Sequence, residues 1–221
     1  MTESTLLRMH RQALAERWHG AFRMSTDRGY IDHAISEIVH HHQSPLRAYH
    51  TLVHVEHVHR ELAPIVSELE NPEGVSVATD THDIIQEPKV GGDEENSLKW
   101  AETTLEMFGI PKHRCSSLAP CVLATKHAHD GPPKHPDAQY FADADLAILG
   151  QSAGDYAVYV AGVRQEYAWV PEFVYRQERA KVLQAFLDRS RVYWTEYFQD
   201  KYETIARQNV AAEIKALSNP A

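Results

Sequence analysis

Apolar residues recur at steps of three and four along most of the chain, and this spacing constrains the fold more than any other feature. Leu7, Leu14, Trp18 and Phe22 form the first such series, and residues 173–217 carry the longest one. This period puts apolar side chains on one face of an α-helix. No segment alternates as a β-strand does, and no internal repeat is visible. The sequence therefore predicts an all-α fold.

The helical segments are expected to form one domain, because no linker-like tract divides the 221 residues. A chain of this length can bury a sizeable core. Residues 1–24 are predicted to form an N-terminal helix packed on that core. The main helical bundle is expected at residues 25–215, followed by a flexible tail at residues 216–221.

The charge of the chain limits its partners. Its formal net charge is −9, which disfavours binding to nucleic acid or to an anionic membrane. The two cysteines, Cys115 and Cys121, are expected in one helix and match no zinc or redox spacing. With no secretory leader and no apolar run near about 18 residues, we expect a cytoplasmic protein. A homo-oligomer stays open.

A helix predicted at residues 45–68 carries His50 and His54, four positions apart and hence on one face. Either histidine can be a core residue with a hydrogen-bonded ring, or it can bind a ligand. For His54, which is expected to face inward, the residues alone favour a core histidine. For His50 and Arg47, a role toward substrate and a structural ion pair are both open.

A second predicted helix, at residues 73–85, ends with the adjacent pair His82 and Asp83. Burying both groups is costly unless they bind a cation. Asp145 lies in another apolar run, where an unpaired carboxylate would also be costly. With His54 these residues form a mixed nitrogen and oxygen set, which suits a divalent metal ion with open coordination positions.

The order His54, His82, Asp83, Asp145 resembles the signature of the HD superfamily of metal-dependent phosphohydrolases. Four longer motifs are similar to the branch known as "predicted metal-dependent phosphohydrolase": Arg-x-Tyr-His-x3-His at 47–54, Asp-Ala-Asp-Leu-Ala-Ile-Leu-Gly at 143–150, Tyr-x2-Tyr-x3-Val-Arg-x-Glu-Tyr at 156–167, and Arg-x2-Val-Leu-x2-Phe-Leu at 179–187. The resemblance covers about residues 25–215. It implies an HD-domain helical bundle that binds a divalent ion (Mn, Mg, Co, Fe, Ni or Zn).

The resemblance also implies roles for individual residues. The metal ligands would be His54, His82, Asp83 and Asp145. Asp83 and Glu94 are the candidate catalytic residues. The candidates for binding a small phosphorylated substrate are Arg47, His50, His127, Arg164, Tyr167 and Arg179. Arginine suits phosphate because its planar fork donates two parallel hydrogen bonds.

Several of these assignments have a structural alternative. The three arginines can instead pair with Glu166, Glu172 or Glu178. His127 is expected near the end of a helix at residues 111–128, where a histidine is also favourable without any ligand. In the loop at residues 86–96, Gln86 replaces the usual aromatic residue and residues 93–97 only approximate the expected Asn-Glu-x-x-Ser. The role of Glu94 therefore stays open.

The expected function is a hydrolase that cleaves a nucleotide or another small phosphate ester through a metal-activated water. Two alternatives use the same scaffold. An HD-type di-iron oxygenase would need extra histidines, which His50 and His127 could supply. A catalytically silent helical module could bind metal for stability alone.

Overall fold

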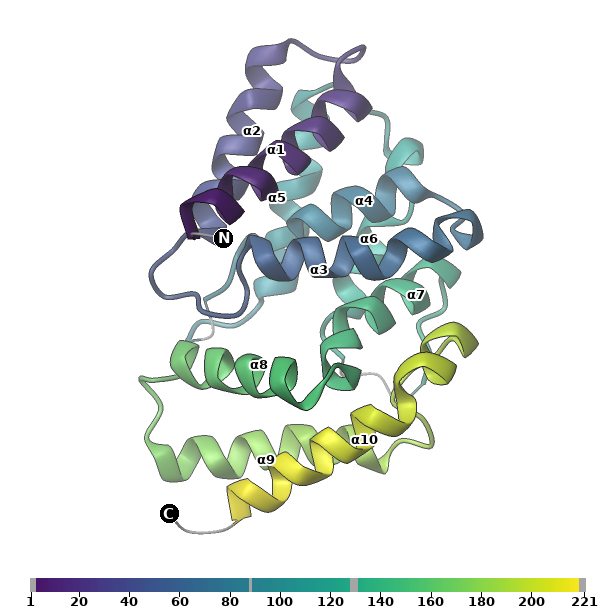
Figure 1. Cartoon of the computed structure of the whole chain (residues 1–221). Helices are drawn as coiled ribbons and strands as arrows, with labels where there is room; N and C mark the ends of the chain where they lie inside the picture. Colours follow the sequence, from purple (N-terminus) through teal and green to yellow (C-terminus); the bar gives the residue numbers. More distant parts are fainter. Residues whose placement is uncertain (1–2, 88, 128–130, 219–221) are drawn as a thin grey trace.

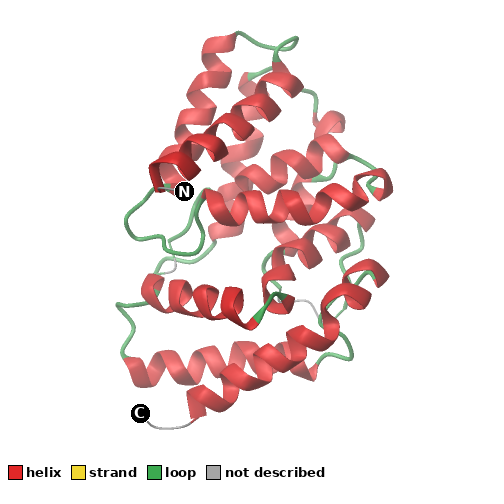
Figure 2. Ribbon diagram, viewed as in Figure 1, coloured by secondary structure: helices red, strands yellow, loops and turns green. Residues whose placement is uncertain are grey.

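Every regular element in the described part of the chain, residues 3–87, 89–127 and 131–218 of a computed structural model, is helical (Figure 2). The all-α prediction is confirmed. The elements are α1 (Glu3–Phe22), α2 (Arg28–His42), α3 (Leu52–Leu62), η1 (Ala63–Glu68), α4 (Pro72–Thr81), α5 (Asp93–Met107), η2 (Lys112–Cys115), α6 (Leu118–Ala124), α7 (Pro136–Asp145), η3 (Leu146–Gly150), α8 (Ala153–Glu166), α9 (Glu172–Asp188) and α10 (Glu196–Ser218).

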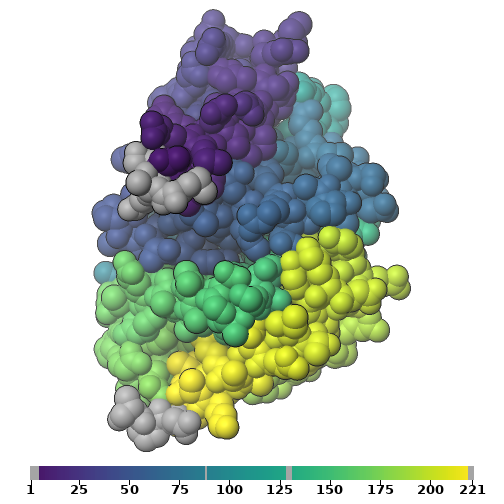
Figure 3. Space-filling view, viewed as in Figure 1, coloured from purple at the N-terminus to yellow at the C-terminus, as the bar shows by residue number. Residues whose placement is uncertain are grey.

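The helices form two groups joined through α7 (Figure 1). Helices α1 to α6 make the larger group, in which α1 contacts α2 and α4 contacts both α3 and α6. Helices α8, α9 and α10 make the other group, and η3 contacts both α8 and α10. The surfaces of α8 and α10 lie next to each other on one face (Figure 3). In the interior, Tyr156 of α8 donates a hydrogen bond to Glu213 of α10. No described helix has both the length and the apolar composition needed to cross a membrane.

One continuous hydrophobic core extends from Leu14 in α1 to Val210 in α10. A buried carboxylate, Asp80, holds α1 against it. Asp80 accepts hydrogen bonds from Arg17 at 2.8 Å and from the indole of Trp18 at 3.0 Å, and it also contacts the ring of His59 at 2.8 Å. Since buried charges are stable only when paired, this cluster fixes α1 and α3 beside the end of α4.

The helix predicted at residues 45–68 is shorter than expected. Helix α3 begins only after Thr51, whose hydroxyl accepts a hydrogen bond from the backbone of Val53. The three preceding N–H groups, at residues 48–50, donate to the carboxylate of Glu166 instead. The prediction that His50 and His54 share one helical face is therefore wrong. The change from α3 to η1 occurs at Pro64, as its ring predicts.

The C-terminal ends of two further helices lie earlier in the chain than the sequence predicts. Helix α4 ends at Thr81 rather than at residue 85, and the carbonyl of Ile84 accepts a hydrogen bond from Arg47. The helix predicted at residues 111–128 is divided into η2 and α6 and ends at Ala124. The two cysteines consequently lie in different elements. Residues 128–130 and 219–221 are outside the described part of the chain.

Candidate metal centre

Four side chains from three parts of the fold converge at one point. His54 lies in α3, His82 and Asp83 follow α4 directly, and Asp145 is the last residue of α7. The Nε2 atom of His54 is 3.1 Å from Nε2 of His82 and 3.0 Å from Oδ1 of Asp145. Oδ2 of Asp83 is 3.1 Å from Nε2 of His82 and 3.5 Å from Nε2 of His54. The structure thus gives His54, His82 and Asp83 the spacing of a shared metal site and places the fourth predicted ligand, Asp145, beside the two histidines.

These separations fit a shared divalent ion. Ligand atoms about 2.1 Å from a metal lie about 3.0 to 3.4 Å apart when they occupy neighbouring coordination positions. Both imidazoles are nearly inaccessible, with 3% of His54 and 1% of His82 exposed. Nδ1 of His82 donates to the carbonyl of Thr79 at 3.1 Å, which directs Nε2 toward the other ligands. The chemistry and orientation of these donors therefore suit a cation.

The charges around this point reinforce one another. Burial lowers the pKa of His82, but the Asp83 charge and hydrogen bonds with both aspartates outweigh burial and raise this pKa well above its usual value. Burial raises the pKa of Asp145, but hydrogen bonds with His127, His54 and His82 hold it well below its usual range. Burial also raises the pKa of Asp83, but the charges of His82 and His50 and the hydrogen bond with His82 hold it well below its usual range. Both aspartates are consequently ionised, as metal ligands must be.

His127 orients the fourth predicted ligand. Its Nε2 atom is 2.9 Å from Oδ2 of Asp145, the oxygen that faces away from His54. The backbone of His127 is left-handed, with φ of +50°, and its carbonyl accepts a hydrogen bond from Arg189. Left-handed backbone at a residue other than glycine is uncommon and collects at functional sites. The strained turn after α6 thus places this imidazole against Asp145.

A cavity of about 720 Å³ reaches the edge of this group, where Asp83 and Asp145 form part of its lining. The side chains of these two residues are 22% and 14% exposed, whereas the histidines beneath them are closed off. Five of the other predicted catalytic or substrate-binding residues also line it: His50, Glu94, His127, Tyr167 and Arg179. A small molecule in this cavity would contact Asp83 and Asp145 rather than His54 and His82.

Glu166 holds His50 at the cavity. The sequence suggests Glu166 only as a partner for an arginine. Oε2 of Glu166 is 2.7 Å from Nδ1 of His50, while Oε1 accepts the three backbone N–H groups at residues 48–50. Burial raises the pKa of Glu166, but these contacts outweigh burial and lower it to about 2. A glutamate at the end of a helix gave no local signal for this role, because its partners are over a hundred positions away.

The three predicted arginines differ in their surroundings. Arg47 donates to the carbonyls of His50 and Ile84, and Arg164 donates to the carbonyls of Tyr167 and Val170 and to Glu172. Neither lines the cavity. Arg179 does line it, but its guanidinium already donates to Glu213 and to the hydroxyl of Tyr159. The first two arginines thus fix the backbone beside the site.

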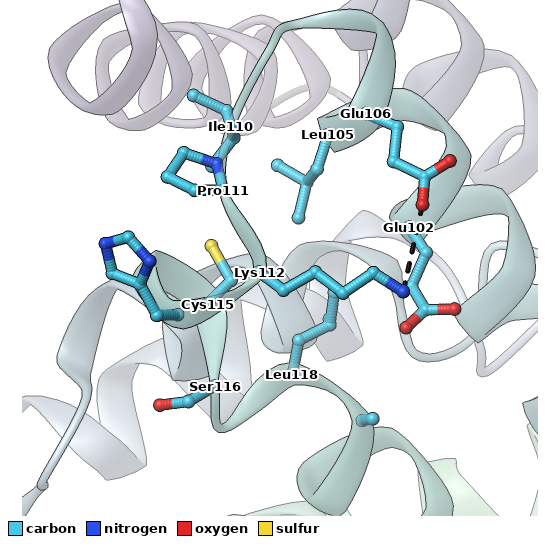
Figure 4. A pocket seen from close by; sticks show the side chains of 11 residues that line it. Glu102, Leu105, Glu106, Ile110, Pro111, Lys112, Cys115, Ser116 and Leu118 are labelled. Carbon is cyan, nitrogen blue, oxygen red and sulfur yellow. Dashed lines mark ion pairs between the residues drawn. The ribbon is translucent and has the colours of Figure 1, made fainter.

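A second cavity, of about 370 Å³, lies between α5 and residues 110–119, apart from the four converging side chains (Figure 4). Lys112 pairs with Glu106 at 3.8 Å on its wall. Burial raises the pKa of the Cys115 thiol to about 11, so this group is not a reactive thiolate near neutral pH. We therefore assign no catalytic role to this second cavity.

Comparisons with models of protein families, with curated proteins and with solved structures find no match for the chain. The chemistry of the 720 Å³ cavity is therefore the firmest guide to function.

Proposed function

We propose that this protein is a metal-dependent phosphohydrolase of the HD type, acting on a small phosphate ester. The observation that carries the proposal is the convergence of two imidazoles and two carboxylates at the floor of a cavity large enough for a small molecule. The resemblance of the sequence to HD phosphohydrolases supports the same reaction class.

His54, His82, Asp83 and Asp145 would hold the ion. When bound, a divalent ion lowers the pKa of a coordinated water and offsets the negative charge of a phosphoryl group. Asp83 faces the cavity with part of its carboxylate exposed. It is therefore placed to accept a hydrogen bond from the attacking water and to orient it toward phosphorus.

The phosphoryl oxygens would meet donors on both sides of the aspartates. Burial lowers the pKa of His50, but the charges of Asp83 and Glu166 outweigh burial and raise it, which favours the cationic imidazole. His127 lies on the other side, bonded to Asp145. Glu94 also lines the cavity, and its carboxylate has no hydrogen-bond partner among the described residues. It is thus free to give a proton to the leaving alcohol or take one from water.

The described residues support one ion rather than two. Their one group of histidine, cysteine and acidic side chains with metal-binding spacing is His54, His82 and Asp83, with Asp145 beside it. His50 and His127, which a second ion would need, do not belong to that group; they bond to Glu166 and to Asp145. This arrangement favours the hydrolase over the di-iron oxygenase.

The test is release of inorganic phosphate from a panel of nucleotides, sugar phosphates and simple phosphate esters, with manganese, cobalt or magnesium. We expect activity with at least one ester, and its loss in His82→Ala and Asp83→Ala. The matched control is His40→Ala, because His40 is exposed at the end of α2. Full activity in His82→Ala would contradict the proposal, and two irons per chain without phosphate release would point to the oxygenase.

A further inference from the structure

Away from its charged floor, the 720 Å³ cavity has apolar walls. Its walls, contributed by α8, α9 and the turn between them, are mainly aromatic and aliphatic. Six of the residues that form these walls are Tyr159, Val163, Tyr167, Trp169, Val174 and Phe186. Ligand pockets of this kind hold the non-polar part of a ligand while a few polar groups fix its orientation.

The apolar wall continues to the protein surface. Trp169, Val174 and Val182 all line the cavity, and they are 48%, 43% and 52% exposed. Phe173, beside Val174 on the first turn of α9, is 71% exposed. Exposed apolar groups collected at the mouth of a cavity indicate a surface that is covered when a ligand binds. Because the apolar wall and the aspartates line the same cavity, one ligand can contact both.

The charges lining the cavity limit the ligand further. Five described lining residues are acidic: Asp83, Asp93, Glu94, Asp145 and Glu178. The described lysine and arginine on the lining are Lys126, bonded to Glu95, and Arg179, bonded to Glu213. A chain of several phosphates would therefore lack opposite charge beyond the floor, since buried anions need paired cations.

Resting on the proposed function, we infer that the substrate is a phosphate monoester with an extended apolar body. Its single phosphoryl group would bind the ion that Asp83 and Asp145 help to hold, and its alkyl or aryl body lies along the walls of α8 and α9. Polyphosphates fit poorly because the cavity offers no unpaired lysine or arginine among its described lining residues for the additional phosphates. Compact sugar phosphates fit poorly because they leave the apolar wall uncovered.

A series of n-alkyl phosphates from ethyl to octyl tests this inference. The leaving alcohols have nearly equal acidity, so differences in rate report binding of the chain rather than the reactivity of the ester. We expect kcat/KM to rise about fourfold for each added CH2 group, the gain typical of burying a methylene, until the chain fills the cavity. The kcat/KM for octyl phosphate should exceed the values for ribose 5-phosphate and for the nucleoside monophosphates. A flat series, or a nucleoside monophosphate cleaved tenfold faster than octyl phosphate, would overturn it.

Matched valine variants locate the effect. Val182→Ser adds a hydroxyl to the apolar wall, whereas Val66→Ser makes the same change on η1, where Val66 is 50% exposed and lines none of the cavity. We expect the octyl-to-ethyl ratio of kcat/KM to fall severalfold in Val182→Ser and to stay at the wild-type value in Val66→Ser. Equal ratios in both variants would overturn the placement of the chain.

Binding of alkyl phosphonates separates this inference from the proposed function, because their carbon–phosphorus bond is not hydrolysed. Calorimetry with the Mn²⁺-loaded protein should show affinity rising with chain length. If it rises while no ester is cleaved, the apolar site stands and the hydrolase proposal fails. If esters are cleaved but phosphonate affinity is independent of length, or no phosphonate binds, the inference is overturned.

Discussion

The Nε2 atoms of His54 and His82 face each other at 3.1 Å, although the two residues belong to different helical segments. At this distance two imidazole nitrogens repel each other unless a proton or a cation lies between them. Asp83 and Asp145 flank the pair within 3.6 Å, so the group has the charge to hold a cation. The following predictions depend on this arrangement.

Metal affinity should increase with pH above neutrality. The raised pKa of His82 keeps its ring protonated in the metal-free protein at pH values where an ordinary histidine is neutral, and an ion must displace that proton to bind. The pKa of Asp145 is lowered, so this carboxylate adds nothing to the trend. Titrations with Mn²⁺ from pH 6 to pH 9 check this. An affinity that is constant over this range would show that the ion does not replace a proton on His82.

Replacing His127 should reduce metal affinity and activity by about tenfold to a hundredfold, the range typical of residues that orient a metal ligand. A glutamine side chain can place its amide nitrogen close to the position of Nε2 and donate to Asp145. We therefore expect His127→Gln to lose less than His127→Ala. The control is His113→Ala, since His113 is exposed and lies outside the main cavity. Equal losses in the two His127 variants would exclude the hydrogen bond to Asp145 as the reason.

Glu166→Gln should lower the pH at which activity declines on the alkaline side. The glutamine oxygen can still accept the N–H groups of residues 48–50, but the charge that helps raise the pKa of His50 is lost. Cationic His50 therefore disappears at lower pH. We also expect kcat/KM near neutral pH to fall about tenfold, from the lost hydrogen bond to His50, whose ring is half-buried. Glu68→Gln, an exposed change, should leave the profile of kcat/KM against pH unaltered.

His42 should make the protein less stable in acid. Its ring is 2% exposed, and burial lowers its pKa to about 3. The unfolded chain binds a proton at about pH 6.5, so the stability associated with neutral His42 is present above that pH and is lost as the pH falls toward 3. At pH 5 this loss amounts to roughly 2 kcal/mol.

Urea unfolding in EDTA at pH 7.5 and pH 5 measures this effect. The free energy of unfolding should fall less in His42→Leu than in the wild type, because leucine cannot take up a proton. The exposed variant His40→Leu should behave as the wild type does. If the wild type and His42→Leu lose the same free energy, burial of His42 does not determine the acid sensitivity.

The helical period was enough to predict an all-α fold. The expense of burying His82, Asp83 and Asp145 indicated these residues as candidate ligands only together with His54 and the resemblance to HD phosphohydrolases. Helix ends beside the site were not predictable in this way. They depend on distant partners, such as Glu166, which binds the backbone before α3. For the same reason, local sequence did not show that Arg47 donates to backbone carbonyls, because the direction of a guanidinium depends on tertiary contacts.

The most direct test of the account is calorimetric titration of Mn²⁺ into metal-free wild-type protein and into His54→Ala, with His40→Ala as the control. If His54, His82, Asp83 and Asp145 bind one cation together, the wild type and the control take up one ion per chain, and His54→Ala loses at least tenfold in affinity. Equal affinity in His54→Ala and the wild type, or no binding to the wild type, would contradict it.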